Sequence, residues 1–340
     1  AQAGRMGQIL YAIAYKKSGA GLEFRSPTPE DLQAVVKAEN IVGNEKADWL
    51  TKNLIPTEMF PKGNDNRPIV YGMPTWSDFF SPRQLLTIGT FSKTLRNLEL
   101  EIRNELGEEE TKAIITYLAF ALDKATIYNC RTSRWHSGRT VVGPQFERHD
   151  FSFKWSHAEF DGASNLLPWT VGQVTKAYSE LVDLLSPSQM QIWSGSQTKK
   201  VSISQGSAST LNSISDHGIY NITVDPPYYD NVQYAELSDF FYVWLKRSVG
   251  HLFSEFFSDE LTNKDDEAVA NPARFESMGR KKKDLAEQDY ERKMAAAFRE
   301  MHRVLHPHGV LTVMFTHKRL EAWDTLASAL IGAGFTIKAS

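Results

Sequence analysis

Residues 221–228, NITVDPPY, contain the pattern that decides the expected fold. The apolar run ITV predicts a strand that ends at Val224. The two prolines that follow fix the backbone angle φ and stiffen the turn beyond the strand. Open α/β sheets bind ligands at the carboxyl ends of their strands. We therefore expect the tetrapeptide Asp225–Tyr228 to lie at a ligand-binding edge.

The tetrapeptide combines groups that suit a planar amine. Asp225 supplies a carboxylate acceptor, Pro226 and Pro227 a rigid backbone carbonyl, and Tyr228 a stacking face. The exocyclic amine of adenine is a weak nucleophile, since its lone pair is delocalised into the ring, and two acceptors on its hydrogens would localise that pair. Positioning and electrostatics would then supply most of the rate. The structural alternative is a strand terminus at a sheet edge, where proline stops the ladder and Tyr228 packs on the rim.

The residues just after the tetrapeptide have two readings. Tyr229, Asp230 and Asn231 precede a helix expected over 235–247. Asp230 and Asn231 either position a bound nucleotide or cap that helix. Both readings remain open from the sequence.

The tetrapeptide resembles motif IV of the amino-group DNA methyltransferases. Longer stretches resemble a large, atypical prokaryotic family of adenine-specific DNA methylases: DPPYYDNVQYAELSDFFYVWLKR at 225–247, AGRMG at 3–7, TWSDFFSPRQLL at 75–86 and RVLHPHGVLTVMFTHK at 303–318.

The resemblance implies a fold, a cofactor and a reaction. The fold would be α/β, with part of a Rossmann-like methyltransferase sheet beside a mainly helical region. S-adenosylmethionine would donate a methyl group to N6 of adenine in DNA, with the target base flipped out of the duplex. Asp at the first motif position favours adenine, and N4 of cytosine stays open as the alternative.

One part of the family pattern is missing. The Gly-rich donor-binding loop of the family follows the first sheet strand, and no glycine cluster here has that context. Gly4 and Gly7 precede an apolar segment, and Gly332 and Gly334 suit a helix C-cap. With no Met at position 1 and a strand-like run at the end, we expect the chain to be a piece of a longer protein.

A second donor contact is expected at Gly206, Ser207 and Ala208. Related methyltransferases have a Gly-Asp-Ala-like turn after the strand that this sequence predicts near residues 201–203. Ser207 stands where that turn has Asp, so a plain Gly/Ser turn remains an equal reading.

Two regions are expected along the chain. Residues 1–165 form a mainly helical, loop-rich region that could contact DNA or recognise its target, and residues 166–340 form the methyltransferase core. A charged segment over 258–289 has little apolar content and is expected to be a mobile loop.

Four side chains are candidates for DNA contact. Arg134 and Trp135 pair a cation with an aromatic ring, which suits phosphate binding and base stacking. Lys281 and Lys282 lie in the charged segment and could close over phosphates. A solvated surface is the alternative for both pairs.

Composition sets limits on these interpretations. The net charge is −3 and the pI is near 6.4, so DNA binding has to rely on local basic patches. Cys130 is the single cysteine, which fits a cytoplasmic protein. No histidine spacing predicts a metal site, and no apolar run is long enough to cross a membrane.

Two rival functions accompany the enzyme hypothesis. The missing glycine loop and Ser207 also fit a DNA-binding or scaffold subunit of a modification, restriction or phage-defence system. An RNA or protein methyltransferase of the same fold is the other rival, because a fold does not fix the substrate.

Overall fold

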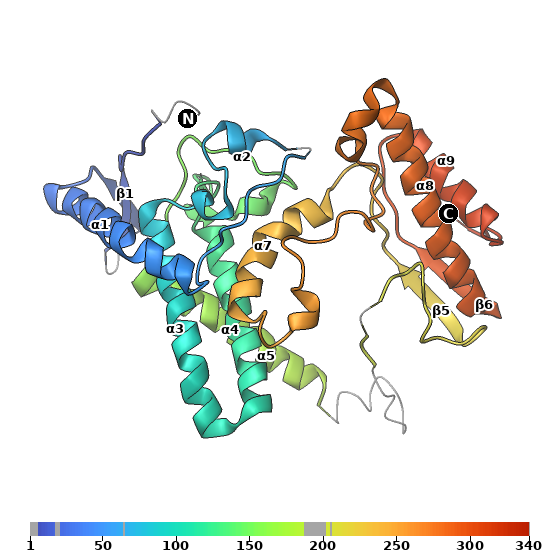
Figure 1. Cartoon of the computed structure of the whole chain (residues 1–340), viewed down its shortest axis with the longest axis horizontal. Helices are drawn as coiled ribbons and strands as arrows, with labels where there is room; N and C mark the ends of the chain where they lie inside the picture. The colour runs from blue at the N-terminus through green and yellow to red at the C-terminus, as the bar shows by residue number, and fades with distance from the viewer. Residues whose placement is uncertain (1–5, 18–20, 64, 187–201, 205, 340) are drawn as a thin grey trace. The chain divides into compact units, whose positions relative to one another are not determined.

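A computed structural model describes residues 6–17, 21–63, 65–186, 202–204 and 206–339. The chain divides into two compact units, shown in Figure 1. Unit 1 comprises Ala1–Thr198 with Leu237–Thr262, and unit 2 comprises Lys199–Glu236 with Asn263–Ser340. Each unit is described by itself.

The described helices and strands alternate irregularly along the chain. The helices are α1 (Pro29–Thr51), α2 (Arg67–Val70), α3 (Pro82–Leu106), α4 (Glu108–Tyr128), α5 (Leu167–Leu184), α7 (Tyr234–Ser248), α8 (Lys282–Val304) and α9 (Leu320–Gly332). The strands are β1 (Ile13–Lys16), β2 (Leu22–Arg25), β3 (Arg134–His136), β4 (Val141–Gly143), β5 (Ile219–Val224) and β6 (Leu305–Val313).

The helices of unit 1 begin at local sequence signals. Thr28 and Asp31 form a capping box at the start of α1, and Ser81 and Gln84 do the same for α3. Each cap is followed by a proline at the first helical position, where its missing N–H has no cost. The antiparallel pair β1–β2 joins the apolar segments around Ile13 and Leu22.

An aromatic core holds unit 1 together. Trp76, Phe79, Phe151 and Phe240 are each almost fully buried, and their rings lie in edge-to-face or stacked contact. Phe240 comes from α7, so this helix packs its apolar stripe into the core of unit 1. α5 packs against α4 in the same unit, although it lies within the region 166–340 that the sequence predicts as a separate core.

Unit 2 is built on a parallel pair of strands. β5 and β6 run parallel with Ile222 opposite Leu311 and Val224 opposite Val313. These four side chains pack against the buried stripe of α8 and the inner face of α9, which cover the same face of the pair in Figure 1. The strand, helix and parallel strand form the crossover unit of α/β proteins.

The fold expectation is therefore met at the coarse level only. The chain mixes α and β, and the described residues contain three two-stranded sheets, of which only β5–β6 is parallel. Residues 202–204 and 335–339 form no strand where the sequence predicts one. Val201 lies outside the described residues.

The charged segment 258–289 is not a loop throughout. A 3₁₀ helix covers Pro272–Lys281, and α8 starts at Lys282. Tyr290 and Met294 anchor α8 in the core of unit 2, and this packing outweighs the low apolar content of the segment before it. Of the helices that the structure describes, none is long and apolar enough to cross a membrane.

Candidate functional site

The site begins where β5 ends, at the carboxyl edge of the parallel pair. The Met314 amide donates to the Val224 carbonyl at 2.9 Å, which is the last bond of the ladder. Asp225 follows and is exposed, whereas Pro226, Pro227 and Tyr228 are half-buried. The structure thus places the tetrapeptide at the end of a parallel strand, as the sequence predicts.

The two proline carbonyls have different surroundings. The Pro227 carbonyl accepts hydrogen bonds from the Tyr229 amide at 3.0 Å and from the Tyr290 hydroxyl at 3.1 Å. Within the part of the chain that the structure describes, no hydrogen bond reaches the Pro226 carbonyl. Pro226 therefore offers an acceptor next to the exposed Asp225 carboxylate.

Tyr228 stands beside both acceptors. A hydrogen bond with the Asp225 carboxylate raises the pKa of its hydroxyl. Its ring meets Phe315 edge to face, with centroids 5.7 Å apart. Phe315 in turn packs edge to face on Trp323 at 5.1 Å. The ring is held by a chain of aromatic contacts and stays partly exposed.

Tyr229 serves the turn rather than a substrate. Its side chain is 3% exposed and packs on Tyr290 with ring centroids 5.0 Å apart. Burial and the Glu287 carboxylate raise the pKa of its hydroxyl well above the ordinary value. Its φ of 59° is in the left-handed region, which a bulky residue adopts only when its surroundings impose it. The role in substrate contact expected for Tyr229 does not fit this burial.

Asp230 and Asn231 are exposed and are held by the loop after β6. His317 Nε2 lies 3.2 Å from Asp230 Oδ1 and 3.1 Å from Asn231 Oδ1. The Arg319 guanidinium donates to the other Asp230 oxygen and lies 5.1 Å from the centre of the Tyr229 ring. These contacts fix the turn immediately after Tyr228.

The N-terminus of α7 has a different cap. The carboxylate of Glu267 accepts from the Ala235 amide at 3.0 Å. Burial raises the pKa of Glu267. Glu267, rather than Asp230 or Asn231, therefore caps the N-terminus of α7.

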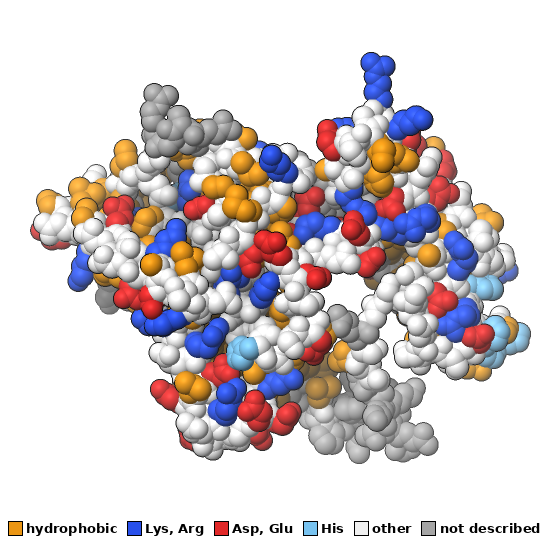
Figure 2. Space-filling model, in the orientation of Figure 1, with side chains coloured by type: hydrophobic (Ala, Val, Ile, Leu, Met, Phe, Trp, Pro, Cys, Tyr) orange, Lys and Arg blue, Asp and Glu red, His pale blue; other side chains and the backbone are white. Residues whose placement is uncertain are grey.

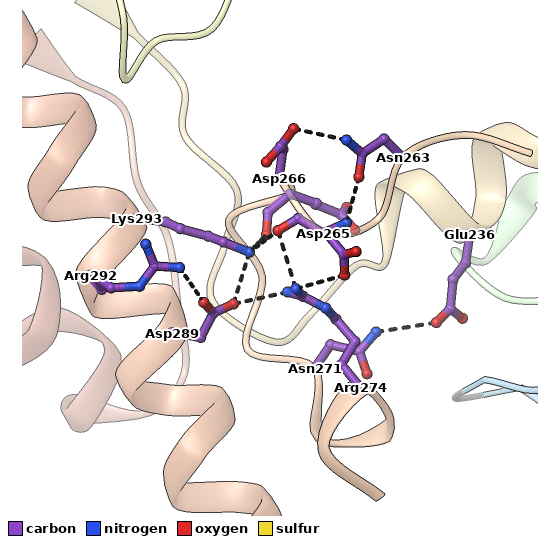
Figure 3. Close-up of polar contacts among 10 residues, drawn as sticks. Glu236, Asn263, Asp265, Asp266, Asn271, Arg274, Asp289, Arg292 and Lys293 are labelled. Atoms are coloured by element: carbon purple, nitrogen blue, oxygen red, sulfur yellow. Dashed lines mark hydrogen bonds and ion pairs between the residues drawn. The ribbon is translucent and has the colours of Figure 1, made fainter. Parts of the chain in front are cut away.

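A polar cluster holds the loop that carries Glu267 against α8 (Figure 3). Arg274 and Lys293 both pair with Asp289, at 2.9 and 2.8 Å. Lys293 also donates to the Glu267 carbonyl at 3.0 Å. Burial alone would raise the pKa of Asp289, but its hydrogen bonds with Lys293 and Arg292 lower it overall. In the same loop, the Ala270 amide donates a hydrogen bond to the Tyr229 carbonyl at 2.9 Å. The cluster therefore helps to hold the backbone of Tyr229 in place.

Lys281 and Lys282 lie near the start of α8. Lys282 pairs with Glu276 at 2.7 Å, and Lys281 is exposed. Lys282 precedes Tyr290 by eight residues, or about 12 Å along a helix. Both lysines are thus in the unit that carries the tetrapeptide, toward the end of α8 that contacts it.

The Gly206–Ala208 turn lies toward the opposite end of the pair. The Thr210 amide donates to the Ser207 carbonyl, and the next amide, of Leu211, donates to Glu300 at 3.0 Å. Glu300 follows Tyr290 by ten residues, or about 15 Å along α8. The structure therefore does not bring Gly206, Ser207 and Ala208 to Asp225.

Arg134 and Trp135 belong to unit 1. Both lie on β3, where Arg134 pairs with Glu147 and Trp135 meets Phe24 edge to face at 5.6 Å. These partners occupy the side chains that the sequence predicts for DNA contact. On the face shown in Figure 2, basic and acidic side chains are intermingled.

Other features lie outside the site. Among the described residues, no group of three or more His, Cys, Asp or Glu side chains could hold a metal ion. A groove of about 590 Å³ runs along α1 and is lined by Leu32, Val36 and their neighbours. None of the predicted site residues lines it.

Comparison with protein-family models, with curated proteins and with solved structures finds no match to this chain.

Several residues that build the site were not predicted from the sequence: Glu267, Tyr290, Phe315, His317 and Arg319. One signal for the last three was present. They alternate after an apolar strand, and a strand beside β5 delivers its following residues to the same edge.

Proposed function

We propose that this chain carries the target-amine site of a DNA methyltransferase acting on N6 of adenine. The observation that supports the proposal is the presence of two neighbouring acceptors at the carboxyl end of β5. The Asp225 carboxylate is exposed, and the Pro226 carbonyl accepts no hydrogen bond from the described residues. Two adjacent acceptors match the two hydrogens of an exocyclic amine. A half-buried Tyr228 ring beside them suits the face of a base.

The roles of the residues follow from their chemistry. Asp225 and Pro226 accept the two amine hydrogens and draw the nitrogen lone pair out of the ring. Tyr228 stacks on the base and orients the carboxylate through its hydroxyl. A duplex base cannot reach an edge of this kind, so the nucleotide is flipped out, and stacking offsets a cost of a few kcal/mol.

The DNA backbone needs cations, which the overall charge of −3 does not supply. Lys281 and Lys282 are the proposed phosphate contacts, because they lie in unit 2 toward the end of α8 that meets the tetrapeptide. Arg134 and Trp135 are weaker candidates, since they belong to unit 1 and not to the unit that carries the tetrapeptide.

S-adenosylmethionine, when bound, would supply the methyl group. The described residues of unit 2 present no glycine-rich turn after a strand at the carboxyl edge, and the Gly206–Ala208 turn lies at the other end. The residues present therefore do not make a donor pocket, and we propose that groups outside them complete it.

The test is methyl transfer by the full-length gene product. Asp225→Ala should abolish methylation of DNA, read by mass analysis of the nucleosides, and leave folding nearly unchanged because the side chain is exposed. Asp324→Ala, which removes an exposed carboxylate from α9 of the same unit, is the matched control. Turnover retained by Asp225→Ala would exclude the proposal. N4-methylcytosine in place of N6-methyladenine would assign the alternative N4 activity.

The second candidate is a non-catalytic DNA-binding or scaffold subunit of a modification or phage-defence system. The position of the Gly206–Ala208 turn, away from Asp225, favours it. Calorimetry with S-adenosylmethionine on the full-length gene product separates the two. Clear binding supports the enzyme, and no binding supports the scaffold.

A further inference from the structure

The loop after β6 contacts the tetrapeptide and the turn that follows it. Residues 315–319 alternate between half-buried and exposed positions, as an extended segment does. The half-buried members, Phe315, His317 and Arg319, are the ones that contact residues 228–231. We call residues 315–319 the strap.

The hydrogen bonds of His317 fix its tautomer. Its Nδ1 accepts the Arg319 amide at 3.1 Å, so Nδ1 has no proton. Its Nε2 faces Oδ1 of Asp230 and Oδ1 of Asn231, which are both acceptors, so Nε2 has the proton. The imidazole is neutral and bonded at both nitrogens, and its side chain is only 2% exposed. The carbonyl of His317 is bonded as well, by the Trp323 indole at 3.1 Å.

Backbone hydrogen bonds connect the turn that His317 holds to the tetrapeptide Asp225–Tyr228. The Asn231 amide donates to the Tyr228 carbonyl at 3.1 Å, and the Tyr229 amide donates to the Pro227 carbonyl at 3.0 Å. Tyr229 between them has φ of 59°, a conformation that persists only where neighbours enforce it. Loss of the Nε2 bonds would leave the turn held only in part, by Arg319 and the Ala270 amide, and would let the Pro226 carbonyl and the Tyr228 ring shift.

We propose that His317, as the neutral tautomer protonated at Nε2, is a positioning residue for the target amine. It holds Asp230 and Asn231, and through their backbone it aims Asp225, Pro226 and Tyr228. This inference rests on the proposed function for its catalytic consequence. Its structural part stands on the contacts of the strap alone.

The kinetic test compares two substitutions in the full-length gene product. His317→Phe keeps the ring volume and loses both hydrogen bonds, and it should lower kcat of methyl transfer about 10- to 100-fold, with KM for DNA changed by less than about threefold. His317→Gln places an amide donor near the position of Nε2, and it should keep kcat within about threefold of the wild type. Asp324→Ala, which changes an exposed side chain of α9 outside the strap, is the control and should leave both constants unchanged. Unchanged kcat in His317→Phe, a loss confined to KM, or a His317→Gln variant as slow as His317→Phe would overturn the proposal.

A second readout does not depend on activity. The ¹⁵N spectrum of the protein labelled at its nine histidines, with His317 assigned by difference from His317→Gln, should show Nε2 protonated and Nδ1 bare. Amide exchange over residues 227–232 should be faster in His317→Phe than in Asp324→Ala. The opposite tautomer, or equal exchange in the two variants, would overturn the role of His317 even if the wild type transferred no methyl group. A correct tautomer in a protein without methyl transfer would instead count against the proposed function alone.

Discussion

The Tyr290 hydroxyl on α8 donates a hydrogen bond to the Pro227 carbonyl, 3.1 Å away. Pro227 thereby has its acceptor engaged inside unit 2, whereas the preceding carbonyl, of Pro226, faces no donor among the described residues. Burial raises the pKa of Tyr290 to about 12, so the hydroxyl remains a donor across the physiological range. Together with the Tyr229 amide, this contact engages the Pro227 carbonyl, and the Pro226 carbonyl is the one left for a ligand.

Removing this hydroxyl should destabilise unit 2. Tyr290→Phe keeps the buried ring and loses one hydrogen bond, so we expect the free energy of unfolding to fall by about 1 kcal/mol in denaturant titrations. Tyr220→Phe is the control, because Tyr220 is 60% exposed on β5, and its change should stay within about 0.5 kcal/mol. Equal effects of the two substitutions would contradict the assigned contact.

Asp289 should make the stability of unit 2 fall at low pH. Its hydrogen bonds with Lys293 and Arg292 lower its pKa in the folded state from the ordinary value of 3.8. Folding therefore favours the ionised form, and this stabilisation is complete above pH 3.8 and is lost as the pH falls through the lower folded value. Urea unfolding at a series of pH values from about 6 to about 3 should show a steeper acid loss for the wild type than for Asp289→Asn. Parallel pH curves for the two proteins would show that Asp289 is not responsible.

Two glycines at the end of α9 should respond in opposite directions. Gly334 has φ of 98° and caps the helix, so Gly334→Ala should cost about 1 kcal/mol or more of unfolding free energy. Gly332 is helical, and a Cβ there would meet nothing within 4 Å, so Gly332→Ala should be neutral or stabilise by up to about 1 kcal/mol. Thermal melts of both variants test the pair. Destabilisation of similar size in both would exclude the cap.

Breaking a buried ion pair should strongly destabilise unit 1. Glu58 and Arg247 lie 2.8 Å apart with side chains 7% and 2% exposed. Glu58→Ala leaves a buried guanidinium without its carboxylate, and we expect a loss of about 3–5 kcal/mol in denaturant titrations. The exposed pair of Asp48 and Lys52 provides the control, since Asp48→Ala should cost less than about 1 kcal/mol. A small effect at Glu58 would mean that water or another acceptor compensates for the lost carboxylate.

The sequence by itself determines where several helices and strands of this protein begin and end. Prolines and capping residues mark the starts of α1 and α3, Gly334 marks the end of α9, and the ITV run followed by two prolines places Asp225–Tyr228 at the end of a strand. These features depend on residues within a few positions of one another, so propensity and turn chemistry suffice to predict them.

The tertiary structure decided which distant residues meet. His317 contacts Asp230 across 87 positions because β6 pairs in parallel with β5 and brings both following segments to one edge. Leu211, three residues after the Gly206–Ala208 turn, contacts Glu300 in the far part of α8 for the same reason, since the chain enters β5 at the opposite end of the pair. Strand register and helix packing set these distances. They are settled only by the burial of the whole core, which no short stretch of sequence encodes.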